Sequence, residues 1–380
     1  MIDNNHEVFK HKHICLVEDH YNPLGIVRSL GEEGIKPIVL LCGANHHLVE
    51  KSKYIGEIHY FNSVEDGYNY MIKNYGNEVL KPFVYNGSDD ITLFLDKHYD
   101  HLKDRFYFTN GGGTIQKYLQ KYDITKLAEE CGLGIPKEEL LNVGELPTTL
   151  KYPVFTKAVT SSNGGAWKDQ AFICESESEL KEAYNKIKAD KILVQEFIRK
   201  KNELCIDGIS INGGEQVFMP YGCHYYRFPK DSYGNYMYFF PFKDKELTDK
   251  IIKVIRGANF TGIFCIEFLV GQDDELYFLE VNFRNSGWSY AFTAGGFNLP
   301  VRWAMSTLND KLYLDGFQYL DKYDVKQELA DFKTHILIQK DVSLGTWIKE
   351  NKKCKCFLIY NKNDKKPFYS MLLHKLPFLK

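Results

Sequence analysis

A pair of apolar segments with a few isolated polar side chains constrains the fold more than any other part of the sequence. Residues 264–270 are apolar except for Glu267, and residues 275–284 follow after a short Gly-Gln-Asp-Asp turn. This pattern predicts a β-hairpin. Burying a carboxylate in so apolar a strand is costly unless the group is paired or binds a metal. The hairpin therefore predicts either a structural ion pair or a metal site.

The polar residues of the second strand alternate with apolar ones. Glu280, Asn282 and Arg284 therefore share one face, because successive side chains of a strand point to opposite faces. Glu267, Glu280 and Asn282 together offer hard oxygen ligands suited to Mg²⁺ with phosphate. Arg284 is placed to neutralise phosphate or a developing anionic charge. The alternative is a surface hairpin with a structural salt bridge from Glu280 to Arg284.

Length and composition favour a soluble, cytoplasmic protein of two or three domains. The 48 basic residues nearly balance the 50 acidic ones, so no general nucleic-acid surface is expected. The nine cysteines form no CxxC pair, which is typical of reduced thiols in a cytosol. The N-terminal residues lack the apolar core of a signal peptide, and no apolar run approaches the roughly 18 residues of a transmembrane helix.

The first hundred residues predict an α/β domain with a parallel sheet, because strands alternate with a helix from Asn22 to about Glu33. Strands are predicted at 13–18, 36–41, 57–61 and 82–85. The first turn contains a single glycine and no GxGxxG pattern, so a nicotinamide or sugar-nucleotide enzyme is disfavoured. The Gly-rich stretch at 110–113 lacks a following Lys-Ser/Thr, and it predicts a connection between domains.

Ser88 and Asp89 follow the last of these strands directly. Ligands bind at the ends of the strands in open α/β sheets, so both residues are candidates for contacting a substrate. Ser88 is also a good N-cap for a helix at 91–102, with acidic residues in its first turn. The two interpretations are equally supported.

A lysine and a glycine-rich loop occur together in the middle of the chain. The strand predicted at 152–157 ends in Lys157, and Ser161-Ser162-Asn163-Gly164-Gly165 follows. Glycines let backbone N–H groups approach phosphate oxygens, and a preceding lysine adds a point charge. A simple Gly-Gly hairpin would have the same local pattern.

These features occur in an order that resembles the ATP-grasp superfamily over about residues 10–305. The acidic hairpin matches the metal-binding end of that family, in which a Glu is followed a dozen or so residues later by Glu-x-Asn-x-Arg. The motifs are similar to those of D-alanine–D-alanine ligase, biotin carboxylase and carbamoyl-phosphate-synthase-like ligases. The single-unit carboxylate–amine ligases fit best, because the chain is short for a biotin carboxylase.

The resemblance implies an α/β (α+β overall) protein with the ATP-grasp fold. A Rossmann-like α/β domain at 1–112 would precede a grasp domain at 113–310, with a lid at about 120–200 and a metal-binding part at about 201–310. A small β-rich extension at 311–380 would follow. Residues 357–360 and 367–373 predict a basic hairpin within that extension.

The resemblance also implies that the chain binds ATP with one or two Mg²⁺ ions, for which Mn²⁺ can substitute. Glu267, Glu280 and Asn282 would hold the metal. Lys121, or its neighbour Lys126, would reach phosphate from the helix predicted at 116–131. The further nucleotide-binding residues implied are Lys157, Ser161, Ser162, Asn163, Gly164, Gly165, the hinge Gln195, Glu196, Phe197 and Ile198, and Glu203 for the ribose.

The implied reaction joins a small-molecule carboxylate to an amine through an acyl phosphate, with Arg284 and Lys157 as catalytic groups. The candidate substrate residues are Arg227, Ser88, Asp89, Ser286 and Gly287, and His20 and His224 are candidate general bases. One alternative is a regulatory ATP-binding protein without turnover. Another is an ATP-grasp enzyme that modifies a cell-envelope or secondary-metabolite precursor.

The last thirty residues are rich in lysine and aromatic residues. A solvated cap on the fold accounts for this composition. A second interpretation is peripheral contact with an anionic surface, either a membrane or a partner protein. A homodimer is a further expectation for the chain.

Overall fold

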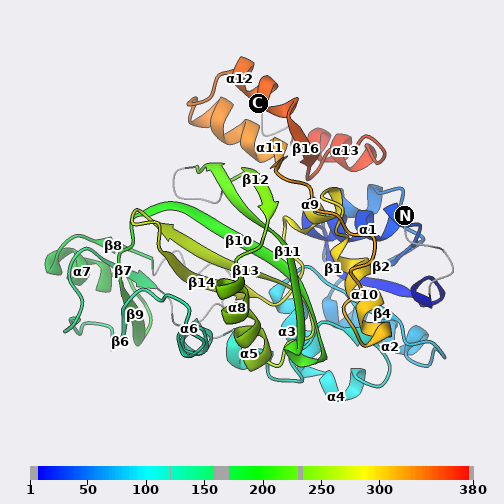
Figure 1. Cartoon of the computed structure of the whole chain (residues 1–380), viewed down its shortest axis with the longest axis horizontal. Helices are drawn as coiled ribbons and strands as arrows, with labels where there is room; N and C mark the ends of the chain where they lie inside the picture. The colour runs from blue at the N-terminus through cyan, green and yellow to red at the C-terminus, as the bar shows by residue number, and fades with distance from the viewer. Residues whose placement is uncertain (1–6, 120, 158, 160–170, 230–233, 376–380) are drawn as a thin grey trace.

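The computed structural model describes residues 7–119, 121–157, 159, 171–229 and 234–375, and three sheets organise them (Figure 1). A five-stranded parallel sheet lies in the N-terminal part. A seven-stranded sheet spans the centre of the molecule, and a four-stranded antiparallel sheet projects to one side. This arrangement confirms the predicted mixed α/β class.

The N-terminal sheet has the strand order β3-β2-β1-β4-β5, and all its pairs are parallel. Four of its five strands match the predicted segments to within two residues, and the short β5 was not predicted. The five strands are β1 (His13–Glu18), β2 (Ile38–Cys42), β3 (Glu57–Phe61), β4 (Phe83–Tyr85) and β5 (Tyr107–Phe108). The helices are α1 (Tyr21–Glu32), α2 (Val64–Tyr75), α3 (Asp89–Lys97) and α4 (Tyr99–Leu102). The order of strands reverses between β1 and β4, where open α/β sheets bind ligands.

The glycine-rich stretch after β5 is a loop that the protein's own carboxylate occupies. Buried Asp96 accepts hydrogen bonds from the backbone N–H groups of Gly111, Gly113 and Ile115 at 2.8–3.0 Å. Asn110 then forms an isolated bridge with Thr261 near the central sheet. The N–H groups that could attract phosphate are thus already bound, which agrees with a connecting role.

The seven-stranded sheet has the order β14-β13-β10-β11-β12-β15-β16 and carries the predicted acidic hairpin at one edge. Its strands are β10 (Lys200–Ile211), β11 (Gln216–Arg227), β12 (Tyr236–Pro241), β13 (Gly262–Gly271), β14 (Leu276–Asn282), β15 (Tyr323–Lys326) and β16 (Cys354–Phe357). Helices α5 (Ile115–Tyr118), α6 (Lys121–Glu130) and α8 (Lys245–Gly257) lie beside this sheet (Figure 1). Short 3₁₀ segments occur at Glu7–Lys10, Val49–Lys51 and Asn212–Gly214.

The four-stranded sheet has the order β6-β9-β7-β8 and packs against helix α7 (Glu177–Tyr184). Its strands are β6 (Glu138–Asn142), β7 (Val154–Lys157), β8 (Ile173–Cys174) and β9 (Lys191–Glu196). The predicted glycine-rich loop at 161–165 lies between β7 and β8, outside the described residues.

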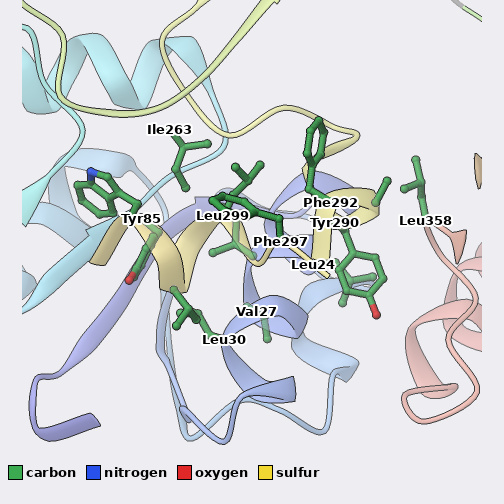
Figure 2. Packing of buried hydrophobic residues seen from close by; sticks show 14 of the residues in the cluster. Leu24, Val27, Leu30, Tyr85, Ile263, Tyr290, Phe292, Phe297, Leu299 and Leu358 are labelled. Carbon is green, nitrogen blue, oxygen red and sulfur yellow. The ribbon is translucent and has the colours of Figure 1, made fainter. Parts of the chain in front are cut away.

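Two helices after β14 join the N-terminal and central sheets in one core. They are α9 (Ser289–Ala294) and α10 (Leu299–Asn309). Figure 2 shows Phe292 and Leu299 of these helices near Leu24 of α1 and Ile263 of β13, and all four are buried. This continuous apolar cluster joins the inner strands β1 and β4 of the N-terminal sheet to β13 of the central sheet.

The C-terminal extension is mainly helical, so the predicted basic hairpin is wrong. Strands β15 and β16 extend the central sheet, and Pro367–Leu373 belongs to a helix. A short apolar run does not distinguish a strand from a buried helix by its pattern alone. The helical segments are α11 (Glu328–Asp331), a π-helix η5 (Phe332–Ile338), α12 (Leu344–Asn351) and α13 (Lys366–Lys375). Among the described residues no helix is long and apolar enough to cross a membrane.

A buried ion pair fastens the extension to the N-terminal part of the chain. Arg28 of α1 bonds Asp364 through its Nε at 3.0 Å, and both side chains are almost fully buried. The same guanidinium donates to the carbonyl groups of Leu358 and Ile359. Asp364 also accepts from the Ser52 hydroxyl at 2.8 Å. Each charge is therefore matched by hydrogen bonds, as buried charges require.

Candidate active site

The β13–β14 hairpin brings the predicted metal ligands together. Glu267 and Glu280 are direct cross-strand partners, and Cys265 is opposite Asn282. The Asn282 amide nitrogen donates to Glu267 Oε1 at 3.1 Å and to Glu280 Oε1 at 3.2 Å. One amide thus lies between two carboxylates on one face of the sheet.

The carboxylate pair carries more negative charge than its surroundings compensate. Burial raises the pKa of Glu267 well above its usual value, and the Glu280 and Glu203 carboxylates raise it further. Like charges opposite one another are destabilising in a sheet unless a cation lies between them. The donor set therefore fits a hard divalent cation such as Mg²⁺. A half-turn of the Asn282 amide would present its oxygen to that cation in place of its nitrogen.

The predicted metal site contains too few ionisable side chains to form a dense cluster. Within the described residues, no group of three or more His, Cys, Asp and Glu side chains is arranged to hold a metal ion. Two carboxylates and one amide leave most positions around an octahedral ion for water and substrate oxygens. Mg²⁺ sites that also bind phosphate are commonly of this kind.

Arg284 continues from the hairpin towards the N-terminal sheet. It forms a bidentate salt bridge with Asp89, through Nε at 3.0 Å and Nη2 at 3.1 Å. Its Nη2 also donates to Asn282 Oδ1 at 3.1 Å. Ser88 caps helix α3 by accepting a hydrogen bond from the Ile91 N–H at 3.2 Å. Ser88 and Asp89 thus position the helix and the arginine.

A cavity of about 330 Å³ opens beside the hairpin, where the N-terminal and central sheets meet. It contains Glu267, Glu280, Asn282 and Arg284, together with the predicted Ser286 and Gly287. The other lining residues are His20, Tyr21, Asn22, Gly87, Tyr225, Asn235 and Trp288. The predicted metal ligands, the predicted arginine and two predicted substrate residues thus share one cavity.

Several cavity residues were not predicted as site residues from the sequence, namely Tyr21, Asn22, Tyr225 and Asn235. Asn22 donates to the Gly87 carbonyl at 2.8 Å and to the Asn285 carbonyl at 2.6 Å. It therefore ties the end of β1 to the loop after β14. The available signal was position, because Tyr21 and Asn22 follow β1 at the reversal of strand order.

His20 and Ser286 already have internal partners in the cavity wall. The His20 ring accepts from the Asn22 N–H at 3.2 Å as the N-cap of α1, and burial lowers the pKa of His20. The Ser286 hydroxyl donates to buried Asp207 at 2.6 Å, and Ser289 donates to the same carboxylate. Burial raises the pKa of Asp207. Ser286 is thus oriented from behind by a carboxylate that does not line the cavity.

Glu203, predicted to bind the ribose, lies on β10 on the same face of the sheet as Glu267. Lys200 pairs with its Oε1 at 2.9 Å, whereas its buried Oε2 has no hydrogen-bond partner among the described residues. A buried acceptor oxygen without a partner is suited to accept a hydrogen bond from a hydroxyl group of a ligand. His224 lies nearby, where its Nδ1 is 2.8 Å from the Glu203 carbonyl and burial lowers its pKa.

The four-stranded sheet, which was predicted to form part of the lid, carries the predicted hinge and lysine on neighbouring strands. Lys157 of β7 and Gln195 of β9 lie on one face of the four-stranded sheet, together with Glu138 of β6. Gln195 donates to Glu138 at 2.8 Å, and burial raises the pKa of Glu138. Glu138 is a further polar residue that sequence reasoning missed.

The rest of the predicted hinge continues from β9. The Glu196 side chain accepts from the Lys137 N–H at 2.8 Å, and the Phe197 N–H donates to the Pro153 carbonyl at 3.1 Å. Ile198 follows directly. Ser161, Ser162, Asn163, Gly164 and Gly165, and the side chain of Lys121, lie outside the described residues. None of the described lid residues lines the 330 Å³ cavity.

Arg227 takes a different place from the predicted substrate clamp. Its guanidinium forms two-point ion pairs with Asp331, at 2.7 and 3.1 Å, and with Glu350, at 2.8 and 2.9 Å. It does not line the cavity. The guanidinium is therefore committed to the C-terminal extension. Its ability to bind carboxylates in a bidentate manner is used within the protein and not for a substrate.

Comparisons with known proteins bear on this geometry. No protein-family model matches the chain. N5-carboxyaminoimidazole ribonucleotide synthase of Staphylococcus aureus is 24% identical over 161 residues, 40% of each chain. Formate-dependent phosphoribosylglycinamide formyltransferase of Bacteroides fragilis is 24% identical over 221 residues, 54% of this chain and 55% of the relative. The matches thus span about half the length of these curated relatives or less.

Solved structures match a larger share of the chain. An L-amino acid ligase from Bacillus licheniformis has a TM-score of 0.61 at 13% identity, covering 83% of this chain and 79% of its own. N5-carboxyaminoimidazole ribonucleotide synthetase in its ADP complex has a TM-score of 0.63 at 18% identity, covering 82% and 80%. Biotin carboxylase from Campylobacter jejuni has a TM-score of 0.61 at 15% identity, covering 77% and 70%.

These three structures match this chain over 77–83% of its length at TM-scores of 0.61–0.63. The chain has the fold of the ATP-grasp superfamily, and the resemblance found in its motifs is confirmed at that level.

Proposed function

We propose that the protein is an ATP- and Mg²⁺-dependent ligase that joins a carboxylate to an amine and releases ADP and phosphate. The observation that carries the proposal is the facing pair Glu267 and Glu280, with Asn282 and Arg284, in one cavity. Their uncompensated negative charge favours binding of a divalent cation, and the nucleotide phosphates would bring their own oxygens to it.

The proposed reaction has two steps. A substrate carboxylate oxygen attacks the γ-phosphorus of ATP, the bond to the β-phosphate oxygen breaks, and an acyl phosphate and ADP result. An amine then attacks the acyl carbon, phosphate leaves, and the amine loses a proton as the amide forms. Such chemistry depends on positioning and on neutralisation of charge more than on a protein nucleophile. No cysteine or serine nucleophile is required.

The residues have distinct proposed roles. Glu267, Glu280 and Asn282 would hold one or two Mg²⁺ ions, or Mn²⁺ in their place, and a bound ion would neutralise phosphate charge. Arg284 would stabilise the transferring group or the acyl phosphate. Lys157 is also proposed to contact phosphate, Gln195–Ile198 to hold the adenine, and Glu203 to bind the ribose. Lys121 and Ser161–Gly165 complete the proposed nucleotide contacts.

The substrates are proposed to occupy the same cavity. Ser286 and Gly287 line it next to the hairpin, and Asp89 reaches it through Arg284. The aromatic rings of Tyr21, Tyr225 and Trp288 form part of its wall. The carboxylate and the amine are thus proposed to be small molecules with an apolar portion that packs against these rings.

We also propose a cellular compartment and binding partners for the protein. All nine cysteines are free thiols, which supports a reducing compartment such as the cytoplasm. We further propose peripheral contact between the lysine-rich C-terminal extension and an anionic membrane, and a homodimer, which light scattering of the purified protein would test.

Thermal shift of the wild-type protein and Glu280→Ala would test the site first. A rise in melting temperature with Mg-ATP that requires Mg²⁺ and is lost in the variant is the expected result. A phosphate-release screen over amino acids, peptides and small carboxylates would then identify substrates. Stabilisation without ADP release from any pair would favour a regulatory ATP-binding protein. No stabilisation by any nucleotide would contradict the proposal.

A further inference from the structure

The outer edge of the C-terminal extension exposes large apolar side chains. Leu337 and Ile338, at the end of η5, are 41% and 64% exposed, and Leu344 and Ile348 of α12 are 53% and 45% exposed. These four residues fall within twelve consecutive positions. In Figure 1, α11 and α12 lie at the top of the molecule, away from the cavity between the N-terminal and central sheets.

The two segments form a helical hairpin that packs on its inner side. The Phe332 and Trp347 rings contact each other with centroids 5.1 Å apart, and the Trp347 indole N–H donates to buried Asp331 at 2.8 Å. Helix α12 has no buried residue. Leu344 and Ile348 lie one turn apart and therefore share a face. The hairpin is thus anchored through one side, while its apolar residues face outwards.

Exposed lysines accompany these apolar residues in the same segment of the chain. Between positions 332 and 355 the exposed charged residues are Asp341 and six lysines, Lys333, Lys340, Lys349, Lys352, Lys353 and Lys355. In the part of the chain that the structure describes, none of these lysines forms an ion pair. The acidic Glu350 of the same segment is bound by Arg227 and Lys326. The exposed large apolar and charged side chains of this segment are therefore four aliphatic residues, six lysines and one aspartate.

We propose that residues 332–355, here termed the docking hairpin, bind the surface of an anionic lipid membrane. Leu337, Ile338, Leu344 and Ile348 would enter the boundary between headgroups and acyl chains. The six lysines would contact the negatively charged headgroups around them. Apolar insertion combined with basic residues is the combination that holds peripheral helices at membranes.

This inference rests on the proposed membrane contact and not on the proposed reaction. A membrane suits this segment because it exposes apolar side chains together with lysines that form no ion pair among the described residues, and an anionic bilayer offers negative charge without fixed positions. The docking hairpin lies apart from the residues that line the cavity. The enzyme could therefore bind a membrane and still admit substrates.

Vesicle flotation of the full-length protein tests the proposal. We expect flotation with phosphatidylcholine vesicles that contain phosphatidylserine, none with phosphatidylcholine alone, and a decrease at high salt. Two variants separate the contributions: the apolar pair Ile338→Asp with Leu344→Asp, and the triple change Lys349→Glu, Lys352→Glu and Lys353→Glu. Each should lower the bound fraction by about tenfold or more. Val79→Asp, at a side chain that is 98% exposed in the N-terminal part, is the matched control and should bind as the wild type does.

The other outcomes are distinguishable. Absence of flotation by the wild-type protein, or equal flotation of all variants, overturns the proposal. A wild-type dimer that Ile338→Asp with Leu344→Asp converts to a monomer, without vesicle binding, would assign the surface to a second copy of the chain instead. The thermal shift with Mg-ATP reports the nucleotide site in every variant. Loss of vesicle binding with that shift intact therefore leaves the proposed ligase reaction unaffected.

Discussion

Two clusters of charged residues lie towards opposite edges of the central sheet, and they differ in net charge. On β13 and β14, Glu267 and Glu280 face each other, and Arg284, the nearest cation, is already paired with Asp89. On β11 and β15, Arg227 and Lys326 contact Asp331 and Glu350. The second cluster is neutral and internally bonded. The first has surplus negative charge, which a bound cation or protonation of Glu267 would offset.

This difference separates a binding site from a structural one. A balanced cluster needs nothing from outside, whereas an unbalanced one costs free energy until a ligand completes it. The balance also explains why Arg227 does not act as the predicted substrate clamp. Its partners, Asp331 and Glu350, lie 104 and 123 residues further along the chain.

Removal of one member of the balanced cluster should have the largest effect. Arg227→Ala leaves Asp331 and Glu350 with only Lys326, and breaking a buried ion pair costs about 3–5 kcal/mol. We expect a large fall in the free energy of unfolding, measured by denaturant titration. Arg199→Ala, at an exposed arginine, should have little effect. A stable Arg227→Ala variant with a raised KM for the carboxylate would restore the substrate role.

Removal of one member of the unbalanced cluster should instead reduce activity. Glu280→Gln removes a proposed metal ligand and the repulsion with Glu267. We expect ADP release to fall about 10²–10³-fold, as for other preorganised charged groups, without loss of thermal stability. Glu275→Gln changes an exposed acid in the same hairpin and is the control. Destabilisation of Glu280→Gln with normal activity would identify the pair as structural.

The buried carboxylate of Glu328 should make the stability of the protein depend on pH. Burial raises the pKa of Glu328 to about 7, although it accepts a hydrogen bond from the Tyr360 N–H at 2.6 Å. The folded state then binds more protons than the unfolded state between about pH 4.5 and 7, so stability falls as pH rises through this window. The decrease should be at most about 3 kcal/mol.

Unfolding titrations of Glu328→Gln across this window measure that contribution. The amide keeps an acceptor for Tyr360 and cannot ionise, so the decrease should be smaller in the variant. Glu246→Gln, at a side chain that is 81% exposed, should follow the wild-type profile. An identical pH profile for Glu328→Gln and the wild type would rule out this contribution.

The sequence revealed local elements better than their partners. The acidic hairpin and its shared face follow from a period of two, and β1 and β3 have the predicted bounds. The N-cap role of Ser88 also follows from local chemistry. Asn22, by contrast, meets Asn285 across 263 positions, and no local pattern encodes that contact. The fold class and the hairpin residues of the cavity could thus be predicted, but the contacts that bring Tyr21 and Asn22 to the same cavity could not.

The C-terminal extension shows the same limit. The run at 367–373 suits a strand or a helix, and its surroundings select the helix, in which Phe368 packs against Tyr360 with ring centroids 5.3 Å apart. Nor does the sequence show that Asp96 binds the glycine-rich loop. Such outcomes depend on contacts between distant segments, which decide between local structures of similar free energy.

The smallest predicted effect concerns the ion pair between Asp89 and Arg284, which is one of the contacts that link the two sheets at the cavity. Asp89 and Asp90 both lie in the first turn of α3, so replacing either with Asn should lower stability by only about 0.3–1 kcal/mol. Asp89 alone pairs with Arg284, and Asp89→Asn should release that guanidinium from its fixed orientation. We therefore expect kcat/KM to fall about tenfold in Asp89→Asn and to remain near the wild-type value in Asp90→Asn. Steady-state kinetics with an identified substrate pair would measure both. Equal kinetics in the two variants would mean that Arg284 needs no orientation from Asp89 and that only the hairpin defines the reacting site.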